Sequence, residues 1–140
     1  MPPRYGHLVR ILHSCTDQKI TSALASMELT AAQGPILGFI ERAPRPPCSR
    51  DIEEAFRLSH PTVSGLLSRL EKKGFIAFTA DPQDRRCKRI QVLPKGQQSF
   101  QRILQAIQAN EARLVEGFSP AEKAQFTALL ERAIAMSKRI

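Results

Sequence analysis

Apolar side chains recur at every third or fourth position along three long stretches of this sequence, as they do along one face of a helix. These stretches cover residues 5–27, 31–42 and 95–117. Thr30 is followed at capping-box distance by Gln33, which supports the second stretch. Ser119, Pro120 and Glu122 give the same kind of start to a further helix. The pattern therefore predicts four long helices.

Shorter elements occupy the middle of the chain. The proline-rich stretch ERAPRPPCS predicts a connector, and Ser49 at its end can cap a short helix. Ser59 can cap the helix that follows, and Gly74 ends it. Two strands are then predicted, 75–80 and 88–93, joined by the turn DPQDRR.

The order of helix, turn, helix and hairpin is that of a winged helix-turn-helix. We expect one domain over residues 1–140, mainly α with a small β-hairpin. Within it, residues 30–94 are expected to form the winged helix-turn-helix lobe, and residues 1–29 and 95–140 a helical region. The first and last helices carry more apolar surface than so small a lobe can cover, which predicts a partner for them.

The helix expected over residues 60–74 has two different faces. Its apolar stripe is expected to pack inward and consists of Val63, Leu66, Leu67 and Leu70. The opposite face is small and polar at its start and basic further on, and consists of Pro61, Thr62, Ser64, Gly65, Ser68, Arg69 and Lys72. Such a face suits the major groove of DNA, which requires little bulk, hydroxyl donors and an arginine for guanine. An ordinary amphipathic surface helix is the alternative.

Positive charge is concentrated in the same part of the chain. The sequence has 21 Lys and Arg against 13 Asp and Glu, and its net charge of +8 favours a polyanionic partner. Residues 49–99 hold ten basic and six acidic side chains, half of the total excess. A solvated basic surface without such a partner is the simpler alternative.

The turn between the two strands carries the densest charge. Arg85, Arg86 and Lys88 lie at or beside its tip, where a cation can enter a narrow minor groove. We expect Asp84 to hold Arg86 in one rotamer through a wing salt bridge. Capping of the turn by Asp84 is the alternative.

Two motifs in this region resemble those of one known family. Leu-Glu-Lys-Lys-Gly at 70–74 and Asp-Pro-Gln-Asp-Arg-Arg at 81–86 are similar to the end of the recognition helix and to the wing in the MarR (multiple antibiotic resistance regulator) transcription factors. TAAQGPIL at 30–37 resembles the family's second helix, and the order of long helices agrees along the chain. Pro94 departs from the usual capping threonine, and Ala77-Phe78 from a commonly charged pair.

The resemblance implies a homodimer in which helices from both chain ends interlock and each wing and recognition helix binds duplex DNA. Two-fold symmetry implies a pseudo-palindromic operator, with recognition helices about 34 Å apart. The implied function is a sequence-specific transcriptional regulator, in most members a repressor that a small phenolic or lipophilic effector releases from DNA. No cofactor is expected.

Other classes of function fit the sequence less well. We expect no enzymatic activity, because no Gly-rich phosphate loop, H-E-x-x-H motif or nucleophile elbow occurs. His7, His13 and His60 are dispersed, so no metal site is expected either. RNA binding is weakly supported, since aromatic residues make up 6% of the chain. The alternative function is a winged-helix module that binds protein without binding DNA.

The three cysteines form no C-x-x-C pair, which favours a reducing, cytoplasmic location over a disulfide framework. Four cations surround Cys87 and favour its reactive thiolate, so we consider it a candidate redox thiol. Cys15 is the competing candidate, by resemblance to the organic-peroxide-responsive branch of the family. An incidental strand cysteine is the alternative for Cys87. No apolar run reaches membrane-helix length and no signal-peptide pattern occurs, so no membrane contact is expected.

Overall fold

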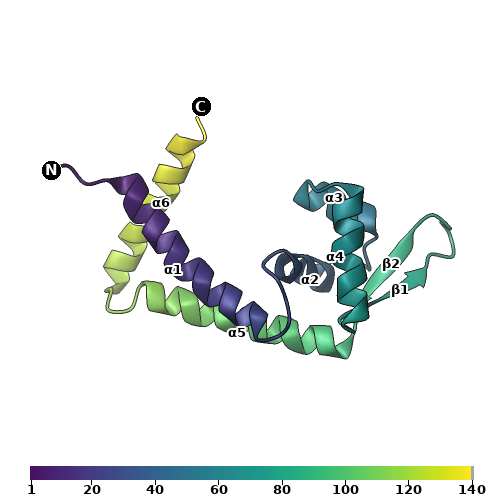
Figure 1. Cartoon of the computed structure of the whole chain (residues 1–140). Coiled ribbons are helices and arrows are strands. Elements are labelled where there is room, and N and C mark those ends of the chain that lie inside the picture. The colour runs from purple at the N-terminus through teal and green to yellow at the C-terminus, as the bar shows by residue number, and fades with distance from the viewer. Residues whose placement is uncertain (140) are drawn as a thin grey trace.

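The computed structural model describes residues 1–139, which form six helices and a two-stranded antiparallel sheet (Figure 1). In chain order the elements are α1 (Tyr5–Ala25), α2 (Gln33–Arg42), α3 (Ser49–Phe56), α4 (His60–Lys72), β1 (Ile76–Ala80), β2 (Lys88–Val92), α5 (Pro94–Leu114) and α6 (Pro120–Ser137). The predicted winged helix-turn-helix, mainly helical with one hairpin, is confirmed. Along the described chain, no helix combines the length and the apolar character needed to span a membrane.

One apolar core joins α2, α3 and α4 to the hairpin. Its fully buried members include Leu37 of α2, Ile52 of α3 and Ile90 of β2. The predicted inner stripe of α4 is confirmed, since the buried residues of this helix are Val63, Leu66, Leu67 and Leu70. Each large aliphatic side chain buried in this way contributes about 1.5–3 kcal/mol. The core therefore fixes which face of α4 points outward.

Helices α1 and α5 run side by side and carry the lobe at one end (Figure 1). The Asn110 side-chain nitrogen on α5 donates to the Thr16 carbonyl of α1 at 3.2 Å. Over its whole described length, Pro120–Ser137, α6 has no buried residue. Within one chain, the terminal helices therefore leave much of their apolar surface uncovered.

Both predicted capping boxes form their reciprocal bonds, although α2 begins at Gln33, with Ala32 at its cap position, and not at residue 31 as expected. The Gln33 N–H donates to Thr30 Oγ1 at 3.2 Å, and the Thr30 N–H donates to Gln33 Oε1 at 3.0 Å. At α6, the Glu122 N–H donates to Ser119 Oγ at 3.1 Å and the Ser119 N–H to Glu122 Oε1 at 2.8 Å. Each pair satisfies two amide donors that the first turn of a helix cannot bond internally.

The expected cap of α3 is wrong by one position. Ser49 is the first residue of the helix, and Cys48 occupies the cap position. The Asp51 carboxylate accepts from the Cys48 N–H at 2.9 Å, which is the reciprocal half of a capping box. Asp51 stands three residues after Cys48, so its spacing places the start of the helix one residue earlier than the serine indicates.

The predicted start of the third long helix is close to the observed one, and its end is not. Helix α5 begins with Pro94 in its first turn and ends at Leu114, short of the expected residue 117. Gly117 follows with φ +86°, a left-handed conformation that favours glycine and turns the chain into α6. At the other end, a Cβ on Gly96 would lie 2.4 Å from the Phe75 carbonyl oxygen. Glycine there allows α5 to pack directly against the base of the hairpin.

Candidate nucleic-acid interface

Local sequence signals set the two ends of α4. The Thr62 N–H donates to Ser59 Oγ at 3.4 Å, and Pro61 lies in the first turn, where it removes no internal hydrogen bond. Gly74 follows the helix with φ +82°, as in many helix ends. His60 Nδ1 lies 3.1 Å from Glu53 Oε2, which connects the start of α4 to α3. The helix is thus held at its start as well as along its buried stripe.

The outer face of α4 is open to solvent. Six of the seven residues singled out from the sequence are exposed, namely Pro61, Thr62, Ser64, Ser68, Arg69 and Lys72, and Gly65 is half-exposed. Among the described atoms, a Cβ built on Gly65 would meet nothing within 4 Å. No neighbour within the chain therefore requires a glycine at this position.

The hairpin projects away from the lobe beside α4 (Figure 1). Its strands pair with Phe78 opposite Ile90 and Ala80 opposite Lys88. Arg85, Arg86 and Lys88 are all exposed at or next to the tip. The wing thus presents three cations to solvent on a scaffold fixed by the buried Ile90.

The salt bridge of the wing differs from the expected one. Among the described residues, the side chains of Asp84 and Arg86 form no ion pair; instead the Arg86 N–H donates to Asp84 Oδ1 at 3.0 Å. This is the turn-capping role that we considered as the alternative. The ion pair of the wing joins Arg89 to Asp81, with Arg89 Nη2 3.1 Å from Asp81 Oδ2. Arg86 is consequently not held by Asp84 and can turn toward a ligand.

Asp81 holds both the turn and the returning strand. Its Oδ1 accepts from the Gln83 N–H at 2.9 Å, and its Oδ2 accepts from Arg89 Nε at 3.2 Å. The hydrogen bond from Gln83, together with the bond and charge of Arg89, lowers the pKa of Asp81. Asp81 is therefore ionised at neutral pH and stabilises the turn of the wing.

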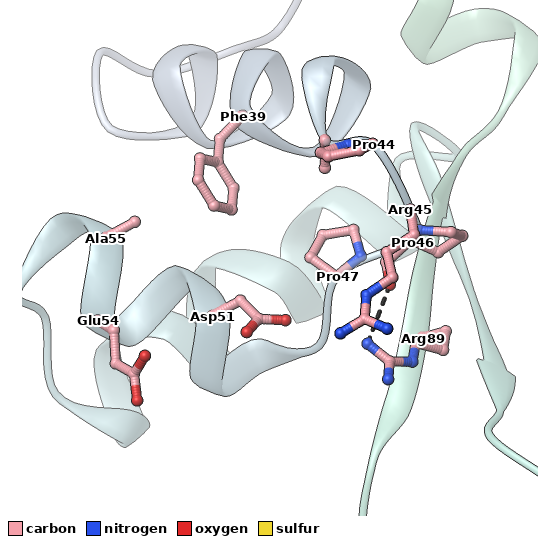
Figure 2. A pocket seen from close by; sticks show the side chains of 10 residues that line it. Phe39, Pro44, Arg45, Pro46, Pro47, Asp51, Glu54, Ala55 and Arg89 are labelled. Carbon is pink, nitrogen blue, oxygen red and sulfur yellow. Dashed lines mark hydrogen bonds between the residues drawn. The ribbon is translucent and has the colours of Figure 1, made fainter. Parts of the chain in front are cut away.

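The proline-rich connector completes the wing. The Ile90 N–H donates to the Pro47 carbonyl at 2.8 Å, and Arg89 Nη1 donates to the Pro46 carbonyl at 3.1 Å. Figure 2 shows Arg45 and Arg89 on one side of a cavity of about 490 Å³, with the carboxylates of Asp51 and Glu54 toward α3. The connector thus accepts hydrogen bonds from β2 as an additional strand would.

Several of these contacts could not be found from the sequence. The Glu53–His60 pair spans the turn between two helices, and the Arg89–Asp81 pair spans the hairpin. Neither follows a helical or strand period, so no spacing rule indicates them. Only the cap of α3 had a signal in the sequence, namely the position of Asp51 three residues after Cys48.

The structure does not favour a thiolate at Cys87. Burial raises the pKa of the Cys87 thiol, and a hydrogen bond with the Cys48 side chain raises it further, so the neighbouring cations do not prevail. Cys15 is exposed on α1, and Cys48 is half-buried like Cys87. Within residues 1–139, no three His, Cys, Asp or Glu side chains gather as metal ligands would.

Comparisons with known proteins agree with this architecture. A model of the MarR family matches residues 27–86, from the end of α1 to the wing tip. The transcriptional regulator PecS of Dickeya dadantii is 28% identical over 118 residues, which are 83% of this chain and 71% of PecS.

Solved structures extend the similarity to nearly the whole chain. A MarR family regulator from Clostridium acetobutylicum has a TM-score of 0.79 and 26% identity, covering 94% of this chain and 97% of its own. The MepR–DNA complex of Staphylococcus aureus has a TM-score of 0.80 and 29% identity, covering 94% of this chain and 98% of MepR. The chain is therefore similar to the MarR family of transcriptional regulators, in its middle by the family model and over most of its length by PecS and these folds.

Proposed function

We propose that the protein binds an operator in duplex DNA as a homodimer, with α4 in the major groove and the wing along the minor groove. The observation that carries this proposal is the exposed polar and basic face of α4, held outward by its buried stripe beside three exposed wing cations. MepR, whose fold this chain shares, has been solved in complex with DNA. Residues 30–94 are the proposed DNA-binding lobe.

The homodimer is proposed from the apolar faces of the terminal helices. Their exposed large side chains include Tyr5, Leu8, Val9, Ile11 and Leu12 of α1 and Leu129, Leu130, Ile134 and Met136 of α6. A monomer seldom leaves so much contiguous apolar surface in water. Residues 1–29 and 95–140 are the proposed dimerisation region, and a second copy of the chain offers a matching pair of faces.

Two-fold symmetry gives the proposed operator its form. Two recognition helices in successive major grooves lie about 34 Å apart, so the operator should be pseudo-palindromic. Repression by occupancy of a promoter is the regulatory role that we propose, in the cytoplasm, where such DNA is found.

The decisive experiment selects bound fragments from sheared genomic DNA and measures their affinity at several salt concentrations. We expect an enriched inverted repeat and a steep fall of affinity with salt, because phosphate contacts release counterions. Arg86→Ala should weaken operator binding by about 1–3 kcal/mol and leave the fold intact. Absence of any salt-dependent DNA binding would instead favour the protein-interaction module.

We also propose that an effector binds where the lobe meets α1 and α5. A cavity of about 340 Å³ lies there, and its apolar lining includes Leu24, Phe100 and Ile103. Arg42 lies at the same cavity, with its guanidinium carbon 6.0 Å from the centre of the Phe100 ring. An apolar site with one cation suits a small aromatic or lipophilic acid.

Thermal-shift measurements with a panel of phenols and aromatic carboxylates test the effector site. A compound that binds should raise the melting temperature and release the operator, as expected if it prefers a conformation that does not bind DNA. Arg42→Met should weaken the response to carboxylates more than the response to neutral phenols. Equal responses in wild type and in a variant with the cavity filled, Leu104→Trp, would rule this cavity out.

A further inference from the structure

Two of the three cysteines lie together beside the turn of the wing. Cys48 caps α3, Cys87 immediately precedes β2, and both are half-buried. Both side chains line one cavity of about 670 Å³ between the wing and the start of α3. The fold thus brings together two thiols that are far apart in the sequence.

The backbone on each side maintains this proximity. The residue before Cys48 is Pro47, whose carbonyl accepts from the Ile90 N–H of β2 at 2.8 Å. Segments bonded in this way lie about 4.7–4.9 Å apart, like neighbouring strands. Cys87 is itself fixed, because its N–H donates to the Asp84 carbonyl at 3.1 Å and its carbonyl accepts from the Asp81 N–H at 3.2 Å.

The thiol groups also interact with each other. The Cys48 side chain is near enough to Cys87 to be one of the causes that raise the pKa of Cys87. The Cys48 thiol in addition donates to Asp51 Oδ2 at 3.4 Å. Two thiols that line the same cavity can form a disulfide once their sulfur atoms approach to about 2.05 Å.

We propose that Cys48 and Cys87 form a site of reversible oxidation, at which a low-molecular-weight disulfide converts the pair into an intrachain disulfide. One cysteine loses its proton and attacks the reagent, forming a mixed disulfide while one small thiol leaves. The second cysteine then loses its proton and attacks the sulfur of the first, and the second small thiol leaves. Two protein thiols are oxidised, and one reagent disulfide is reduced to two thiols that take up the two protons.

The disulfide is expected to act on the wing. Cys87 lies between Arg86 and Lys88, both exposed beside the tip. Bond formation draws this segment toward the cap of α3 and moves the two cations away from their reduced position. Operator affinity therefore falls on oxidation, a consequence that rests on the proposed function. Since its pKa is raised, Cys87 is a slow attacking thiol at neutral pH.

Peptide mass spectrometry of the full-length protein, equilibrated in mixtures of reduced and oxidised glutathione, tests the linkage. We expect a Cys48–Cys87 crosslink that forms as the mixture becomes oxidising and disappears with excess dithiothreitol. Cys15→Ser should retain it, and Cys48→Ser and Cys87→Ser should each lose it. Serine is a favoured helix cap, so Cys48→Ser removes the thiol while preserving the start of α3.

The outcomes separate the linkage from DNA binding. The proposal would be overturned if the Cys15→Ser protein gave glutathione adducts or links between chains but no Cys48–Cys87 crosslink. Oxidised Cys15→Ser protein should bind the operator about tenfold more weakly than the reduced form, which is the effect of losing one specific contact. The operator affinity of Cys48→Ser should be the same in oxidising and reducing mixtures. A crosslink without any change in affinity would overturn the regulatory part. Failure of the reduced protein to bind DNA would contradict the proposed function and leave the mass measurement of the linkage standing.

Discussion

Gly65 is the residue at which local stability and the proposed function conflict most clearly. Glycine inside a helix costs about 0.5–1 kcal/mol relative to alanine. The inner stripe does not require it, and a Cβ there would have open space among the described atoms. A missing side chain on the outer face does, however, let the backbone of α4 approach a base edge closely.

Gly65→Ala should therefore stabilise the protein while weakening operator binding. We expect the free energy of unfolding to rise by about 0.5–1 kcal/mol and operator affinity to fall, measured by denaturant titration and by fluorescence anisotropy. Gly6→Ala is a matched control, since a Cβ on Gly6 in α1 also meets nothing within 4 Å in the described chain. Because Gly6 lies in the first turn of α1, this variant should gain less stability than Gly65→Ala, and its operator affinity should not change. Unchanged affinity of Gly65→Ala would show that α4 does not enter a groove at this point.

Arg69 and Lys72 allow base contacts to be distinguished from phosphate contacts. Both are exposed on the outer face of α4. Arg69→Ala should reduce discrimination between the operator and single-base variants, because arginine reads guanine through two hydrogen bonds. Lys72→Ala should weaken binding evenly across sequences and reduce the salt slope by about one. Similar profiles for both variants on a panel of operator variants would assign Arg69 to the phosphates.

At the scale of elements, α3 depends on a carboxylate that caps its start. The hydrogen bond from the Cys48 backbone is the largest cause of the lowered pKa of Asp51. A carboxyl group whose pKa is lower in the folded state stabilises the fold above its unfolded pKa of about 3.9. That contribution is lost as pH falls through the folded pKa.

Asp51→Asn should accordingly reduce stability in a pH-dependent way. We expect a loss of about 0.3–1 kcal/mol at pH 7, because asparagine can still accept the bond but lacks the negative charge that suits the start of a helix. The difference from wild type should begin to shrink below about pH 4, where the unfolded carboxyl takes up a proton, and should vanish once the pH falls through the lower pKa of the folded state. Urea titrations at fixed protein concentration from pH 3 to pH 7 provide the measurement. Glu54→Gln, an exposed change on the same helix, should show no comparable loss.

The helices and strands were predictable because each depends on local patterns. The stripe of α4, the box at Ser119–Glu122 and the hairpin follow from spacing alone, and all three are present. The salt bridge of the wing was mispredicted, since Arg89 reaches Asp81 only once the two strands have paired. The pKa of Cys87 depends likewise on burial and on Cys48, which no local charge count includes.

At the scale of the whole molecule, the terminal helices leave large apolar side chains exposed. Leu129 of α6 is 58% exposed and Ile134 is 54% exposed, although both are large apolar residues in a regular helix. An amphipathic helix gains most of its stability from packing its apolar face, which α6 does not achieve within one chain. The proposed dimer provides that packing.

Leu129→Glu should dissociate the proposed dimer, because a carboxylate buried at the interface lacks a partner. Light scattering coupled to size exclusion should then give the monomer mass of 15.6 kDa, where wild type gives twice that value. Operator affinity should fall strongly, since half-sites are then bound independently. Gln125→Glu, an exposed polar change on the same helix, should remain dimeric. A monomeric wild type would refute the proposed assembly.

Because α6 has no buried residue along its described length, the abundance of the protein in a cell should depend on its assembly. In the proposed dimer both terminal helices are covered, whereas a protomer without a partner exposes them to proteases. Turnover should therefore be fastest in cells with few copies and slow as copy number rises. A substitution on the apolar face of α6 then changes transcription chiefly by lowering the abundance of the regulator, even where each surviving dimer binds its operator normally.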